Sequence, residues 1–159
     1  MQSSSFQVDK EFGTIKSDSL ESSGALKLRH AAASGMVKTQ SAPTAYAVTT
    51  TLTIADLLTG IVRHSGTGAV TWTLPTATLA VAGVSGVKVG DSIDFSVIND
   101  ATTTATIVTL ASAGTAAIVG YALVQPRIAT ALNTGSGLFR LRFDDVDGTG
   151  NDYTVYRLS

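Results

Sequence analysis

Two histidines, His30 and His64, are the first residues of this chain that suggest acid–base or metal chemistry. Neither has a partner at the spacing of a metal-ligand motif, and the chain contains no cysteine. Although Ser65 follows His64, adjacency in sequence does not place a base on a nucleophile. We therefore interpret both histidines as solvated or structural, and we expect no catalytic residue, no metal and no cofactor.

Two carboxylates, Asp91 and Asp94, lie three residues apart in VGDSIDF. Residues three apart in a strand point to opposite faces, so these two do not share a substrate. Asp91 is most simply part of a turn with Gly90.

The acidic segment from Asp144 to Asp152 partly matches a calcium-binding loop. Counted from Asp145, it has Asp147 at the third position and Gly150 at the sixth, but Tyr156 replaces the bidentate glutamate at the twelfth. Asp and Gly are also preferred in tight hairpin loops. We favour a hairpin between two strands, with weak calcium binding as the alternative.

Three arginines, Arg140, Arg142 and Arg157, come together if that hairpin forms. Together they are able to hold an anionic partner, but such residues more often pair with nearby carboxylates, here Asp94 or Asp144. We favour the pairing.

These residues are positioned by segments with a period of two, which is typical of strands with one buried face. Trp72 lies on the apolar face of one such segment, which predicts a core residue rather than a sugar-stacking platform. The clearest segments are Val48–Ile54, Val70–Leu74, Ile93–Val97 and Phe139–Phe143; weaker ones are Ile61–His64, Thr104–Leu110, Ala116–Val119, Arg127–Leu132 and Tyr153–Leu158.

Two short helical turns interrupt the strands. In TIADLLTG, Thr53 is placed to cap a helix, Asp56 is its third residue and Gly60 ends it. The segment Thr76–Gly83 follows a proline and predicts a second turn. The spacing of the strands predicts an all-β fold: a compact β-sandwich or jelly-roll-like domain of about eight short strands with an extended N-terminal arm.

The composition changes near Ala45 and predicts two parts: an arm over residues 1–44 and an oligomerising β-domain over residues 45–159. The arm is rich in serine and charge and has too little apolar surface for a core of its own. Its segment Glu21–Gly35 is compatible with a short helix or a strand, and we favour an extended conformation. The residues we expect to anchor the arm on a partner are its scattered apolar ones, Phe6, Val8, Phe12 and Ile15.

Charge is scarce in this chain of 159 residues: 14% of them are charged and the formal net charge is −1. This balance gives no electrostatic basis for nucleic-acid binding. The uncharged segment from Ala101 to Pro126 is interrupted by threonines and glycines, which favours short strands over a membrane span. Because outward strand positions are Thr, Ser and Ala, we expect copies of the chain to cover one another's faces.

Four segments, TLTIADLLTGIV, TWTLPTATL, VGDSIDFSVIN and YTVYRLS, resemble a β-domain found in tailed-bacteriophage virions. Similar domains occur in capsid decoration (cement) proteins and in head or tail fibre proteins. The resemblance covers Thr51 to Ser159 and implies a trimeric β-sandwich or jelly-roll-like domain that binds the outer shell of the phage head.

From the residues and this resemblance together we expect a non-enzymatic decoration protein, a homotrimer on the outer surface of the capsid. We expect it to bind the major capsid protein through the arm, with Phe6, Val8, Phe12 and Ile15 as the capsid-binding residues. The alternative is the receptor- or glycan-binding head of a phage fibre. A third interpretation, a polysaccharide depolymerase, requires two carboxylates across a cleft, and no pair in the sequence is a candidate.

Overall fold

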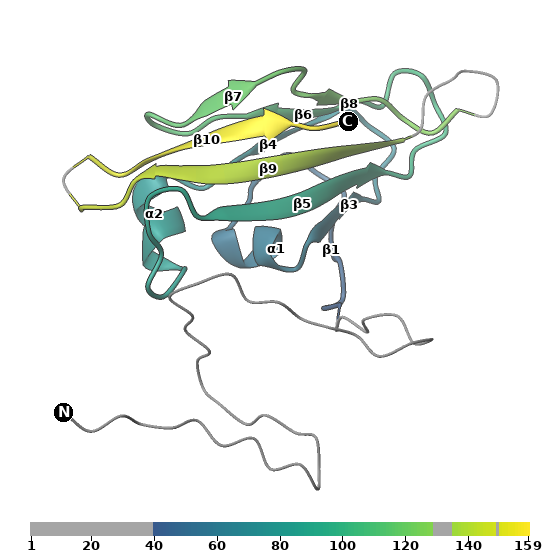
Figure 1. The fold of residues 1–159 in the computed structure, drawn as a ribbon. Coiled ribbons are helices and arrows are strands. Elements are labelled where there is room, and N and C mark those ends of the chain that lie inside the picture. Colours follow the sequence, from purple (N-terminus) through teal and green to yellow (C-terminus); the bar gives the residue numbers. More distant parts are fainter. Residues whose placement is uncertain (1–39, 129–134, 149) are drawn as a thin grey trace, which may run out of the picture. The chain divides into compact units, whose positions relative to one another are not determined.

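The computed structural model of this chain describes residues 40–128, 135–148 and 150–159 (Figure 1). The predicted arm residues Phe6, Val8, Phe12 and Ile15, and the segment Glu21–Gly35, lie outside the described residues. The described residues form two β-sheets and two short helices, so the expectation of a mostly β fold with two sheets is confirmed.

The larger sheet has six strands and the smaller has four (Figure 1). In spatial order the six-stranded sheet contains β1 (Thr44–Tyr46), β3 (Ile61–His64), β5 (Ser92–Asn99), β9 (Ser136–Asp145), β10 (Asp152–Arg157) and β7 (Ala117–Val119). The four-stranded sheet contains β2 (Thr50–Thr51), β4 (Val70–Thr73), β6 (Val108–Ala111) and β8 (Leu123–Val124).

The chain alternates between the two sheets from β1 to β8. As a result β1, β3 and β5 are parallel neighbours in one sheet, and β2, β4 and β6 are parallel neighbours in the other. Parallel strands need a crossover connection, and here each crossover passes through the opposite sheet. Only the later strands pair antiparallel: β8 with β6, and β9 with both β5 and β10. This mixture differs from sandwiches such as the immunoglobulin fold, whose sheets are antiparallel.

Both predicted helical turns are confirmed. Helix α1 (Ile54–Leu58) begins after the N-cap Thr53, and helix α2 (Ala77–Ala82) begins after the N-cap Thr76. In each helix the threonine side chain accepts a hydrogen bond from a backbone N–H of the first turn, which is why the chain stops being extended there.

The strand predicted over Val48–Ile54 is wrong over most of its length. Only Thr50–Thr51 pairs as a strand, and the side chain of Val48 is 65% exposed. Residues before Thr50 bend as the chain passes from one sheet to the other, and the cap at Thr53 draws Ile54 into α1. Of the apolar residues in this alternating segment, only Leu52 and Ile54 have buried side chains.

Further differences concern short strands. Thr104–Ile107 was predicted as part of a strand, but β6 starts at Val108. Arg127 and Ile128 belong to no strand, and the rest of the strand predicted over Arg127–Leu132 lies outside the described residues. Strands β1 and β8 were not predicted. Strand β1 lies across the expected boundary between the arm and the β-domain near Ala45, and a two-residue strand such as β8 shows no alternation. The other predicted strands are present, within a few residues at their ends.

One hydrophobic core is shared by both sheets and both helices. Trp72 of the smaller sheet and Phe95 of the larger sheet are buried, as their positions in alternating segments predicted. Phe95 stacks on Phe139 across β5 and β9, with ring centroids 5.6 Å apart. The largest buried side chains are Trp72, Tyr153, Phe95, Phe139 and Phe143.

Candidate functional site

The acidic segment forms the hairpin loop between β9 and β10, as predicted. Its side chains bond to the loop's own backbone: Asp145 Oδ1 accepts the N–H of Asp147 at 3.0 Å, and Asn151 Oδ1 accepts the N–H of Gly148 at 2.8 Å. Across residues 40–128, 135–148 and 150–159, no three histidine, cysteine or acidic side chains are grouped so that they could hold a metal ion. The loop is explained by turn formation.

Two of the three arginines pair with carboxylates, as predicted. Arg140 makes a bidentate ion pair with Asp94 on the neighbouring strand β5, at 2.6 and 2.7 Å. Arg142 pairs with Asp144, which also accepts a hydrogen bond from the Thr154 hydroxyl at 2.6 Å. Arg140 therefore pairs across strands, whereas Arg142 pairs with the residue two positions along its own strand, and both pairs lie on one face of the sheet.

The pairing prediction is wrong for Arg157. Its guanidinium donates to the backbone carbonyls of Tyr121, Leu123 and Ser159 and lies over the ring of Phe139, 5.4 Å from the centroid. Arg157 is opposite Phe139 in the register of β9 and β10, so it points toward the smaller sheet and away from Arg140 and Arg142. It ties β10 to the β7–β8 connection and is not part of an anion-binding cluster.

Asp91 lies in a turn, as predicted. Its carboxylate accepts the backbone N–H of Lys88 at 2.9 Å, and Gly90 beside it has a φ of +94°, which favours glycine. Asp91 and Asp94 have separate structural partners and do not converge on a common point.

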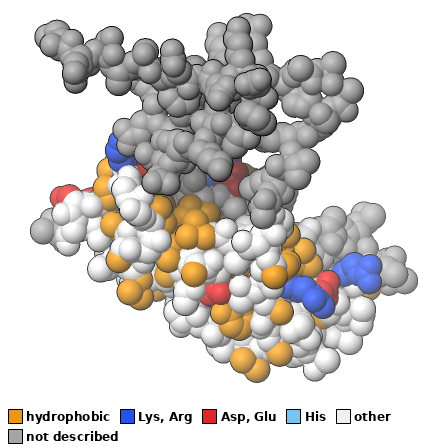
Figure 2. Space-filling view, turned by 90° about the horizontal axis from the view of Figure 1, so that it is seen from below, with side chains coloured by type: hydrophobic (Ala, Val, Ile, Leu, Met, Phe, Trp, Pro, Cys, Tyr) orange, Lys and Arg blue, Asp and Glu red, His pale blue; other side chains and the backbone are white. Residues whose placement is uncertain are grey.

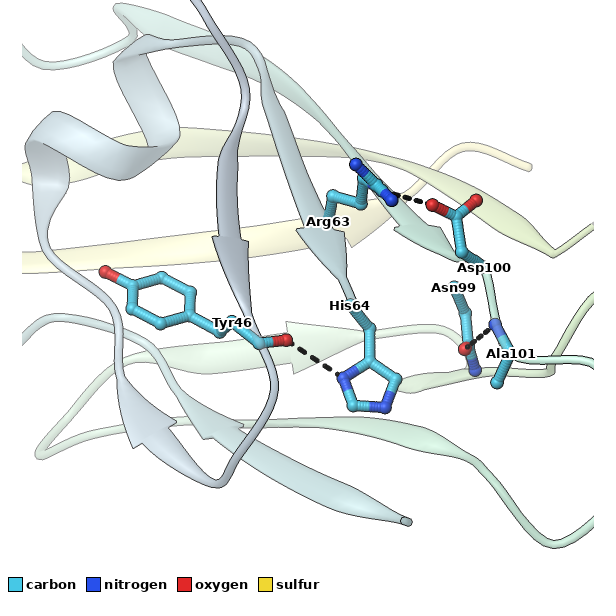
Figure 3. Close-up of polar contacts among 6 residues, drawn as sticks. All are labelled: Tyr46, Arg63, His64, Asn99, Asp100 and Ala101. Atoms are coloured by element: carbon cyan, nitrogen blue, oxygen red, sulfur yellow. Dashed lines mark hydrogen bonds and ion pairs between the residues drawn. The ribbon is translucent and has the colours of Figure 1, made fainter. Parts of the chain in front are cut away.

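His64 is a buried structural histidine at the end of β3 (Figure 3). Its ring nitrogens lie 3.1 Å from the carbonyl oxygens of Tyr46 and Gly68. The ring therefore joins strand β1 to the loop that follows β3, and neither nitrogen faces a hydroxyl nucleophile.

Asn99 performs a related task at the end of β5 (Figure 3). Its amide nitrogen donates to the carbonyls of Thr106 and Val124, at 2.8 and 3.0 Å, and its amide oxygen accepts the N–H of Ala101. This fully buried side chain connects the larger sheet to β8 in the smaller one. Among the described residues, no buried side-chain nitrogen or oxygen lacks a hydrogen-bond partner.

Asp56 is the one buried carboxylate of the described residues. Burial by itself raises the pKa of Asp56, but hydrogen bonds from the Thr53 backbone and hydroxyl and from the Tyr46 hydroxyl outweigh it, so the pKa is lowered. Burial and the neighbouring Asp56 carboxylate raise the pKa of Tyr46. A carboxylate held ionised by several hydrogen-bond donors is suited to fixing a helix start rather than to exchanging protons.

An open depression of about 280 Å³ lies beside α2 and the β9–β10 loop. Its described lining includes the side chains of Thr76, Thr78, Thr115 and Asn151. These groups are hydroxyls and an amide, and no acid or base is among them.

The outer faces of the two sheets differ in charge. Strands β2, β4, β6 and β8 contain no charged residue, and the outward positions of that sheet are Thr51, Thr71, Thr73, Thr109, Ala111 and Leu123. The six-stranded sheet carries the ion pairs described above, together with apolar side chains that sequence reasoning missed. Leu138 and Leu158 are 36% and 48% exposed. The sequence indicated the outward position of Leu138, because it is next to the inward Phe139 in an alternating segment.

Figure 2 shows another side of the molecule, on which hydrophobic and uncharged polar side chains intermingle and charged ones are few.

No family model, curated protein or solved structure matches this chain. None of the helices in the described part of the chain has the length and apolar character needed to cross a membrane.

Proposed function

We propose that this chain is a non-enzymatic structural protein of a tailed-phage virion, which decorates the outer capsid surface as a homotrimer bound to the major capsid protein. In this proposal the two sheets pack face to face as a sandwich, in keeping with the single core that they share. The arm, residues 1–44, provides the attachment through Phe6, Val8, Phe12 and Ile15.

The observation that carries the proposal is the outer face of the four-stranded sheet, which has threonines and no charge. A small domain normally needs charged, interspersed surfaces to remain dispersed, and neutral sheet faces favour association. An assembly protein covers such a face with a neighbouring subunit or with the shell.

The use of the polar side chains supports the same proposal. Asp56, His64 and Asn99 hold the ends of strands and helices. Arg140 pairs with Asp94 across strands, and Arg142 pairs with Asp144 within β9. The segments that carry the resemblance to phage domains form β2 with α1, β4 with α2, β5 and β10, which build the core. The resemblance therefore concerns architecture rather than a reaction.

The test is the position of this chain in intact particles of the phage that encodes it. Cryo-electron microscopy of those particles, with mass spectrometry of the purified virion, is expected to place density for the β-domain on the outer face of the head. Density confined to the tail, or no copy of the chain in the virion, would contradict the proposal.

A second candidate, a glycan-binding fibre head, is favoured by one observation. Tyr121 is 59% exposed after the glycine that follows β7, and an exposed aromatic ring is able to stack on a sugar. Binding to a glycan array that is lost in Tyr121→Ala, with density on the tail, would favour this candidate over decoration.

A further inference from the structure

The outer face of the six-stranded sheet carries a cluster of apolar side chains from three adjacent strands. We define the outer patch by four residues: Val119 at the end of β7, Leu138 on β9, Tyr156 on β10, and Leu158 directly after β10. Val119, Leu138 and Leu158 are 50%, 36% and 48% exposed, and Tyr156 is half-buried.

The strand register places these four side chains beside one another. Tyr156 is opposite Val119 on β7, and the N–H of Leu158 donates to the carbonyl of Leu138 at 2.8 Å. Tyr156 and Leu158 are two residues apart and share a face, and side chains directly opposite on neighbouring strands lie about 5 Å apart. The buried residues Phe139 and Val155 alternate with them and point the other way.

The charges that border the outer patch are already paired within the chain. Arg140 lies between Leu138 and Arg142 on β9 and is opposite Tyr156; it is held by Asp94 through two hydrogen bonds. Arg142 is paired with Asp144. Covering this face therefore leaves neither of these arginines without a carboxylate, so the larger penalty of burying an unpaired charge does not arise.

We propose that the outer patches of neighbouring copies of this chain meet around the symmetry axis of the oligomer, so that the apolar side chains of each copy pack against those of the next. This inference rests on the self-assembly in the proposed function and names a surface for it on the six-stranded sheet, in addition to the neutral face of the four-stranded sheet.

The charge balance of the face favours a second copy as the occupant. Arg140 and Asp94 lie side by side and pair with each other, so a strongly acidic or basic partner meets one like charge for every opposite one, whereas a copy of this chain presents an equally balanced face. Strand β7 is at the edge of the sheet, and among the described strands it pairs only with β10. A neighbour is thus able to reach the outer patch across β7 without displacing another strand.

The experiment uses the full chain, whose lack of cysteine allows a single reactive thiol to be introduced. Leu158→Cys tests the outer patch, and Leu79→Cys is the matched control, because Leu79 is a 61% exposed leucine on α2, away from this sheet face. Both variants are spin-labelled, and inter-copy distances are measured by pulsed electron resonance. A short inter-copy distance for the label at 158, with none at 79, is the expected result.

A second experiment replaces apolar side chains of the outer patch with charged ones and measures self-association. Leu138→Glu and Leu158→Glu are compared with Leu79→Glu by sedimentation velocity, with circular dichroism as the check on folding. We expect each patch variant to be folded and to self-associate at least about tenfold more weakly, as loss of a central interface residue does, while the control is unchanged.

Four outcomes overturn the inference. If the chain forms an oligomer in which the labels at residue 158 are mobile and far from one another, another face makes the contact between copies, and the decoration proposal still stands. A label at 158 that is immobile only while residues 1–39 are present shows that the arm covers the patch. Patch variants that fold and associate like the wild type also overturn it. The highest concentration tested is 100 µM, about a hundred times a micromolar dissociation constant. A wild-type chain that is still monomeric at this concentration contradicts self-assembly itself.

Discussion

Thr53 and Asp56 cap helix α1 reciprocally. The N–H of Asp56 donates to the Thr53 hydroxyl at 3.2 Å, and the N–H of Thr53 donates to the Asp56 carboxylate at 2.8 Å. Tyr46 on β1 donates to the same carboxylate at 3.0 Å, so a local cap is also a link between the helix and the larger sheet.

This cap predicts an acid-sensitive contribution to stability. Because the pKa of Asp56 is lowered in the folded chain, its stabilisation is complete above the ordinary aspartate pKa of about 4 and is lost as the pH falls through the lower, folded value. Asp56→Asn is expected to reduce the free energy of unfolding by about 1–3 kcal/mol at pH 7, since hydrogen bonds to a charged group are lost. Urea unfolding at pH 7 and pH 3 should show the gap between the two proteins narrowing in acid.

Asp100→Asn is the control for that measurement. Asp100 pairs with Arg63 at an exposed site, and such pairs contribute at most about 1 kcal/mol. A gap between wild type and Asp56→Asn that stays constant or widens from pH 7 to pH 3 would show that the carboxylate is not what stabilises the helix start.

Trp72→Ala and Phe95→Ala are each expected to reduce the free energy of unfolding by about 3–5 kcal/mol. Both side chains are fully or almost fully buried, and Trp72 also loses the hydrogen bond from its indole nitrogen to the carbonyl of Val48 at 3.2 Å. Tyr121→Ala, at an exposed position, should change the value by no more than about 0.5 kcal/mol. An unchanged melting temperature in either core variant would mean that its strand faces the other way.

Gly66 and Gly68 offer a matched pair on the loop after β3. A Cβ on Gly66 would collide with the backbone carbonyl of Ala47 and approach the His64 ring to 2.9 Å, whereas a Cβ on Gly68 meets no atom within 4 Å. Gly66→Ala should therefore destabilise the protein by about 1–3 kcal/mol, as overpacking does, and Gly68→Ala should not. Equal melting temperatures for the two variants would contradict the close approach of β1 and this loop.

Deletion of residues 1–39 is expected to leave a folded oligomer that no longer decorates capsids. The deletion removes no part of the described strands, and the proposed function assigns attachment to the arm. Capsid occupancy of full-length and truncated protein is compared on undecorated particles. Equal occupancy would show that the β-domain makes the contact by itself.

Features encoded over a few residues were predictable from the sequence. The turns at α1 and α2 were predicted, and for α1 also the cap, because a cap depends only on a threonine and the backbone N–H three residues later. The inward faces of β4, β5 and β9 followed from alternation, because the pleat turns every second side chain to the same side. The hairpin at Asp145–Asp152 followed from its turn residues.

Features that depend on which distant strands meet were decided by the tertiary structure. Alternation does not say whether a neighbour is parallel, so the crossing of the chain between sheets and the parallel pairing of β1, β3 and β5 were not predictable. Arg157 turns inward to the carbonyls of Tyr121 and Leu123 only because β7 and β8 come to lie beside β10. Likewise, the outer patch exists because the register of β9, β10 and β7 brings residues 119, 138, 156 and 158 together, and register is a long-range property that is fixed by the packing of the whole core.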